Sequence, residues 1–173
     1  MKHWHKLLLI PAVVLISPPV LAHDNGLATG LFAGLSHPVS GVDHLAALVL
    51  AGVFIGRFVS GRRLALGGLL LALGLGAGGG LLLGAQAWVE GAILLSLPVF
   101  FALQWIRHAG RMKIAVIMMG LFMIAHGWAH GVAMGGMDTG FAIGFLLASA
   151  GVMGLSSLFG AALESRLTAA GHA

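Results

Sequence analysis

Long apolar runs, each almost free of charge, limit most strongly what this chain can fold into. Across the sequence 59% of residues are hydrophobic and 8% are charged, whereas a soluble domain carries roughly 25% charged residues. Because so little polar surface cannot cover a water-soluble globule, lipid must be the solvent. A membrane-spanning helix needs about 20 apolar residues, so the runs predict an all-α, polytopic transmembrane helix bundle. The five predicted spans are residues 38–56, 64–85, 89–106, 114–131 and 141–161, in a single transmembrane domain covering 23–173.

The first 22 residues have the order of a secretory signal peptide. Lys2 and Lys6 give the N-terminus a positive charge, and an apolar stretch covers residues 7–16. Val20-Leu21-Ala22 then resembles an A-x-A cleavage site. We therefore expect residues 1–22 to be removed. The alternative is an uncleaved first membrane helix.

The apolar stretch Gly26–Leu35 is too short to cross a membrane by itself. It either extends the first span outward or forms a short half-helix in the outer leaflet of the bilayer. Pro38 favours a break between the two segments, because proline is tolerated at the first position of a helix but disrupts a helix interior.

The positions of the basic residues predict how the bundle is oriented. Cytoplasmic loops of membrane proteins carry an excess of Lys and Arg. Here the bases follow the first, third and fifth spans, whereas the loops 86–90 and 131–140 contain none. This predicts a protein of the bacterial inner membrane, with its mature N-terminus in the periplasm and its C-terminus in the cytoplasm. It also accounts for the net charge of +4 without a nucleic-acid partner. The bases concerned are Arg57, Arg62, Arg63, Arg107, Arg111, Lys113 and Arg166.

Glycine recurs every four residues in three apolar segments. This spacing puts small residues on one helix face and lets neighbouring helices approach closely in lipid. The pattern predicts a tightly packed bundle, and it also provides faces for a homo-oligomer. The repeats are Gly26/Gly30/Gly34, Gly76/Gly80/Gly84 and Gly127/Gly131/Gly135.

Ionisable side chains gather at two places inside the predicted spans. His37, Asp43 and His44 lie at the start of the first span, and His126 and His130 lie at the end of the fourth. Such groups cost about 2.5–3.5 kcal/mol each on insertion scales, and so they indicate function. His44 and His126 each lie thirteen residues from a base at the inner end of their span, or about 20 Å along the helix. A single buried histidine is more often a packing residue, but the whole set at one depth predicts a metal or proton site in the outer half of the bilayer.

The absence of cysteine narrows the choice of metal. Thiolate sites are excluded, which leaves imidazole, carboxylate and thioether as the metal-binding side chains. These nitrogen and oxygen donors suit Ni²⁺, Co²⁺ or Zn²⁺. Glu90, the acid of the second outer loop, could join the site or be a solvated carboxylate. His23 and Asp24 would begin the mature chain, where they could capture a metal ion or form part of a frayed tail.

Three short motifs of the chain carry a family resemblance: Ala22-His23-Asp24, His37-Pro-Val-Ser-Gly-Val-Asp43-His44-Leu45 and His126-Gly-Trp-Ala-His130-Gly131. They resemble those of the HupE/UreJ family of small membrane proteins, and the resemblance covers essentially the whole mature chain. It implies a nickel permease that supplies hydrogenase or urease, with related members handling cobalt. It also implies metal-binding roles for His37, Asp43, His44 and His130, and Glu90 matches an acidic position of the family. The family's second motif often continues to a glutamate where this chain has Ala133.

We therefore expect a secondary transporter and not an enzyme. Its substrate would be Ni²⁺, with Co²⁺ as the second candidate, and it would hold no prosthetic group. No nucleotide-binding motif is present, so ion gradients or trapping inside the cell would drive uptake. One alternative is a zinc-dependent intramembrane hydrolase with Glu90 as general base. The other is an accessory protein, similar to a metallochaperone, that does not transport.

Overall fold

The computed structural model describes residues 29–106, 109–134 and 136–170, and the regular elements in these ranges are all α-helices. The predicted all-α bundle is confirmed. The predicted signal peptide and the pair His23 and Asp24 lie outside the described residues. The helices are α2 (Gly30–Ser40), α3 (Val42–Phe58), α4 (Arg62–Leu83), α5 (Ala87–Leu103), α6 (Ala109–Ala133) and α7 (Thr139–Ala170).

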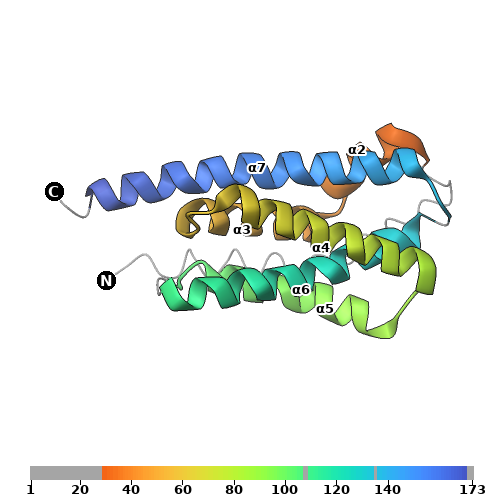
Figure 1. The fold of residues 1–173 in the computed structure, drawn as a ribbon, viewed down its shortest axis with the longest axis horizontal. Coiled ribbons are helices and arrows are strands. Elements are labelled where there is room, and N and C mark those ends of the chain that lie inside the picture. The colour runs from red at the N-terminus through yellow and green to blue at the C-terminus, as the bar shows by residue number, and fades with distance from the viewer. Residues whose placement is uncertain (1–28, 107–108, 135, 171–173) are drawn as a thin grey trace.

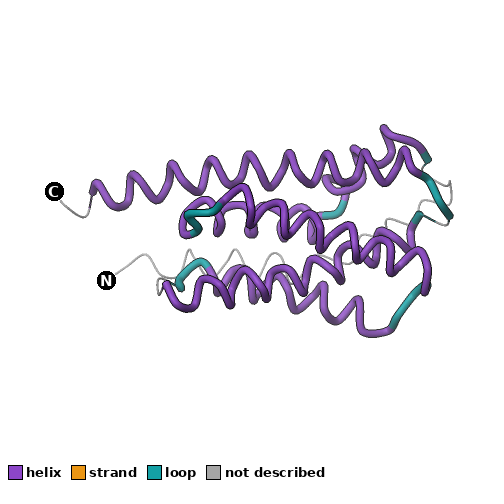
Figure 2. The backbone as a smooth tube through the Cα atoms, in the orientation of Figure 1, coloured by secondary structure: helices purple, strands orange, loops and turns teal. Residues whose placement is uncertain are grey.

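The helices form an elongated bundle in which successive long helices run in opposite directions (Figure 1). The C-terminal ends of α3, α5 and α7 therefore lie beside the N-terminal ends of α4 and α6, whereas α2 lies at the other end (Figure 2). Every Lys and Arg in the described part of the chain belongs to the first of these ends, which we call the basic end. We call the other the α2 end.

Among the described residues, three helices, or four if a bent pair counts as one span, are long and apolar enough to cross a membrane. Helices α4, α6 and α7 are each long and apolar enough to span. Helices α2 and α3 qualify only together, as a pair bent by 79°. Helix α5 is apolar but has 17 residues. A helix thus lies at each of the five predicted positions, and the count of five spans stays a prediction.

The break before the first long helix lies at Gly41, three residues beyond the position predicted from Pro38. Pro38 is buried near the C-terminal end of α2, where its missing N–H removes one helical hydrogen bond. Gly41 has an extended backbone, with φ −98° and ψ 117°, that separates α2 from α3. A Cβ at Gly41 would lie 3.1 Å from Asp43 Oδ1, so the glycine leaves room for the carboxylate at the break.

Glycine brings the helix backbones into direct contact, which confirms the predicted close packing. Gly76 and Gly80 of α4 lie against backbone carbonyls of α6, and Gly127 and Gly131 of α6 lie against those of α4. A Cβ at any of the four would overlap a carbonyl oxygen of the partner helix. Because these faces are occupied within the chain, a homo-oligomer would need other faces, and it stays a prediction. The α3–α7 and α2–α7 contacts use Gly52, Gly56 and Gly160, and Gly34 and Gly144, in the same way.

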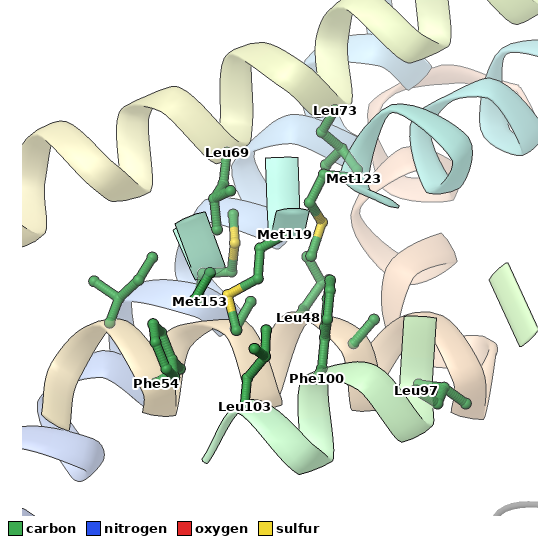
Figure 3. Packing of buried hydrophobic residues seen from close by; sticks show 14 of the residues in the cluster. Leu48, Phe54, Leu69, Leu73, Leu97, Phe100, Leu103, Met119, Met123 and Met153 are labelled. Atoms are coloured by element: carbon green, nitrogen blue, oxygen red, sulfur yellow. The ribbon is translucent and has the colours of Figure 1, made fainter. Parts of the chain in front are cut away.

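Large apolar side chains fill the interior of the bundle (Figure 3). Phe54, Phe100, Met119 and Met153, from four different helices, are fully buried. Leu48, Leu73 and Met123 belong to the same cluster and extend it toward the α2 end. This main cluster therefore runs from near the basic end toward the α2 end, and a smaller cluster of Val89, Ile93 and Ala125 lies apart from it.

An ion pair and two hydrogen bonds connect three helices near the basic end. Arg57 Nε of α3 donates to Glu164 Oε2 of α7 at 3.0 Å, and Arg57 Nη1 donates to the Gln104 carbonyl oxygen at 3.3 Å. The Gln104 side chain donates in turn to the Leu50 carbonyl oxygen at 2.9 Å. These contacts hold the C-terminal ends of α3, α5 and α7 together.

Asp138 makes the corresponding connection at the α2 end. Its carboxylate accepts hydrogen bonds from the backbone N–H of Phe141 at 2.9 Å and from that of Gly30 at 2.7 Å. By accepting from Phe141, the Asp138 carboxylate caps the N-terminus of α7, and by accepting from Gly30 it ties the start of α2 to α7. These two donors hold the pKa of Asp138 below its ordinary value of 3.8.

Replacing Asp138 with asparagine is expected to lower the thermal stability of the purified protein at neutral pH. A carboxylate whose pKa is depressed by folding stabilises the folded state above its unfolded pKa, and it loses that contribution as the pH falls through the folded pKa. The difference between the wild type and Asp138→Asn should therefore be largest at neutral pH and shrink below pH 3.8. Thermal unfolding in detergent across this range measures it, and a difference independent of pH would contradict the role assigned to the charge.

Candidate metal centre

Four of the predicted histidines lie against one another where the break between α2 and α3 meets the end of α6. The ring centroids are 4.7 Å apart for His37 and His130, 4.4 Å for His130 and His44, and 4.9 Å for His44 and His126. Three helices thus contribute to a single row of imidazoles. His37 and His44 are only partly buried, whereas His126 and His130 are buried, so the row joins partly exposed rings to the interior of the bundle.

A small cavity of about 10 Å³ lies at the inner end of this row. That volume is close to what a single water molecule or ion needs. Three histidines and one serine supply the polar part of the wall, and His37 stays outside it, packed against His130 and Phe141. The lining residues are His44, Ala47, Leu48, Leu73, Met123, His126, His130, Phe145 and Ser149.

Three polar atoms on cavity-lining residues have no hydrogen-bond partner in the described part of the chain. They are His44 Nε2, His126 Nδ1 and Ser149 Oγ. A buried polar atom left unpaired costs about 1–3 kcal/mol, so folded proteins rarely keep one without a reason. Three of them around one small cavity indicate that the site is built to bind something polar.

Asp43 determines which nitrogen of His44 is free. Asp43 Oδ1 lies 2.9 Å from His44 Nδ1. An ionised carboxylate can only accept, so His44 Nδ1 carries the proton and donates it. His44 Nε2 is then left with an unshared electron pair, and it is one of the unpaired buried atoms. A carboxylate that orients an imidazole in this way is the usual support of a metal-binding histidine.

Sequence reasoning missed two serines that take part in the site. Ser96 of α5 lies with its Oγ 2.8 Å from His126 Nε2, and Ser149 of α7 lines the cavity. Serine is common at packed interfaces of membrane helices, so its residue type is a weak signal. For Ser96 a depth estimate could have helped, because it lies eleven residues from Arg107 and His44 lies thirteen from Arg57.

Glu90 is the predicted residue that the structure leaves apart from the others. It is exposed in the first turn of α5 and does not line the cavity. Among the described residues, no three His, Asp or Glu side chains already surround one ion position. The imidazoles meet edge to face, so binding an ion would require some of these rings to turn until their electron pairs converge.

Apolar helices packed through glycine, with a buried row of histidines beside an orienting aspartate, define a polytopic membrane protein with a polar site among its helices. The family described as HupE / UreJ protein matches residues 11–172. The chain therefore belongs to the HupE/UreJ family, as its motifs predicted. Protein HupE of Rhizobium leguminosarum bv. viciae is 33% identical over 139 residues, covering 76% of this chain and 71% of that protein. No solved structure matches the chain.

Proposed function

We propose that this protein is a permease for a divalent cation, Ni²⁺ first and Co²⁺ second, which passes through the histidine cavity. The proposal is carried by three buried atoms that have no hydrogen-bond partner and could each give an electron pair to a metal ion: His44 Nε2, His126 Nδ1 and Ser149 Oγ. Their residues line a cavity the size of one ion. Neutral imidazole and oxygen donors without thiolate suit these two metals. Membership of the HupE/UreJ family supports the same reading, because the family resemblance implies nickel supply.

Entry at the α2 end is supported by the surroundings of the cavity. His37, a partly buried ring on α2, leads through His130 toward His44. A second cavity of about 220 Å³, whose lining includes Asp138, lies on the other side of Phe145, which lines both cavities. In the orientation predicted from the basic residues, the α2 end faces the periplasm, from which a scarce metal ion would arrive.

Release at the basic end requires the helices to move. Leu48, Leu73 and Met123 close the cavity on its inner side, and beyond them the Arg57–Glu164 ion pair joins α3 to α7. A static path is therefore absent in the described bundle. Rocking of one group of helices against another, the usual behaviour of secondary transporters, would open it.

The hydrolase alternative loses Glu90, the general base assigned to it. A catalytic zinc ion needs an open coordination position, and the enzyme usually has a carboxylate or imidazole nearby as base. Glu90 is exposed and apart from the cavity, and the described residues that line the cavity include no acid. The site therefore supports binding and passage of an ion better than hydrolysis.

Reconstitution tests the permease directly. We expect proteoliposomes containing the purified protein to take up Ni²⁺, measured with a metal-sensitive dye trapped inside, and His126→Ala to take it up at least about tenfold more slowly because one donor is lost. Protein-free liposomes and equal incorporation of the two proteins are the controls. Wild-type influx no faster than that of protein-free liposomes would reject transport and favour the accessory alternative.

A further inference from the structure

We propose that Ser96 is a positioning residue that determines which ring nitrogen of His126 presents an electron pair to the cavity. The proposal concerns the hydrogen bonds of the protein without metal. Only its consequence for metal affinity rests on the function proposed above.

The direction of the hydrogen bonds follows from counting protons. Ser96 Oγ lies 2.6 Å from the Ile93 carbonyl oxygen and 2.8 Å from His126 Nε2. A hydroxyl has one proton, and a carbonyl oxygen can only accept. The Ser96 proton must therefore point to Ile93, because otherwise two oxygens would lie 2.6 Å apart with no proton between them.

It follows that Ser96 accepts from His126. His126 Nε2 carries the ring proton, and His126 Nδ1 keeps its electron pair. His126 Nδ1 is the atom that is buried without a partner, in a residue that lines the cavity. The proton is thus held on the side of α5, and the electron pair is left for the cavity.

His44 shows the opposite arrangement with the same result. Asp43 holds the proton of His44 on Nδ1, so that Nε2 is free, whereas Ser96 holds the proton of His126 on Nε2, so that Nδ1 is free. The free atom of each ring is unpaired, and both rings line one cavity. Two different partners on two helices have thus selected whichever tautomer leaves an acceptor nitrogen available. A metal ion requires such a nitrogen, because only neutral imidazole binds it.

Without Ser96, His126 should therefore lose its preference for one tautomer, while the residues that line the cavity stay the same. Without the acceptor, the ring could carry its proton on either nitrogen, and in one of the two forms the cavity would meet an N–H. Partners that orient a metal-binding histidine typically change affinity about 10–100-fold when removed. We expect a loss of that size for Co²⁺ or Ni²⁺.

Nitrogen-15 spectra of the protein labelled in its histidines test the tautomer before any metal is added. In the wild type, His126 should show a protonated Nε2 and an unprotonated Nδ1. In Ser96→Ala the two forms should mix, and Ser96→Thr, which keeps a hydroxyl, should restore the wild-type signals. Ser157→Ala is the matched control, because Ser157 is also buried but belongs to α7 and does not line the cavity. A wild-type protein with the proton on Nδ1 of His126 would overturn the proposal, even if the variants do not fold.

Titration with Co²⁺ alone supplies the second measurement. Calorimetry on the same four proteins should give a dissociation constant about 10–100-fold higher for Ser96→Ala than for the wild type, Ser96→Thr or Ser157→Ala. An unchanged constant in Ser96→Ala, together with unchanged histidine spectra, would refute the positioning role. If proteoliposomes fail to transport Ni²⁺ but the His126 tautomer responds as expected, the proposed permease function is wrong and the role of Ser96 stands.

Discussion

Asp43→Asn is expected to reduce Ni²⁺ uptake about 10–100-fold, the range found when the partner of a metal-binding histidine is lost. Asp43 sits in the first turn of α3, directly after the break at Gly41. Its Oδ1 lies 2.9 Å from His44 Nδ1 and holds the ring proton there, which leaves the Nε2 electron pair for the cavity. It also brings a negative charge close to the place where a divalent cation would shed its water.

An asparagine at this position keeps the shape but loses both effects. Its amide can either donate to His44 or accept from it, so the tautomer is no longer determined, and no charge offsets the cation. The loss should appear as a weaker apparent affinity for Ni²⁺ in cells and as less metal retained by the purified protein. The quantity of protein in the membrane must be equal for the two variants.

Glu90→Gln is the matched comparison. It removes the same charge from an exposed position that does not line the cavity. We expect its effect on uptake to be clearly smaller than that of Asp43→Asn, and to weaken as salt screens the attraction of cations to the surface. Equal losses in the two variants, or normal uptake in Asp43→Asn, would remove the special role of the aspartate.

Gly76→Ala is expected to destabilise the bundle by about 1–3 kcal/mol, the usual cost of overpacking a close interface. The added Cβ would overlap the Ile124 carbonyl oxygen, part of the rigid backbone of α6. Helices α4 and α6 would have to separate, which would loosen the packing along the helix that carries His126 and His130.

Gly68→Ala, on the same helix, should not destabilise the bundle. Gly68 is exposed, and nothing lies within 4 Å of the Cβ that alanine would add there. Alanine favours helix over glycine by about 0.8–1.0 kcal/mol in peptides, so this variant should be neutral or slightly more stable. Denaturation of both variants in detergent measures the contrast. Equal stability would mean that α4 and α6 do not meet through Gly76.

The site could be anticipated where its chemistry is unusual for its surroundings. Histidine and aspartate are rare in apolar helices, so their depth along two predicted spans placed them in one layer, and the ring distances agree with that estimate. Serine is ordinary in such helices, so nothing in its residue type distinguished Ser96 or Ser149. Glu90 drew attention by its charge, but charge alone does not say whether a side chain faces a cavity.

The sequence by itself determined that the chain forms apolar helices in a membrane, that its bases gather at one end, and that glycine faces let the helices touch. These properties follow from composition and from spacing along single helices, and they need no knowledge of partners. Only the tertiary structure decided that the first helix breaks at Gly41, after Pro38. It also decided which helix each glycine face meets, that Ser149 lines the histidine cavity, and that Ser96 bonds to one of its histidines. Those outcomes depend on contacts between residues far apart in the chain, such as Ser96 with His126, and no local pattern encodes them.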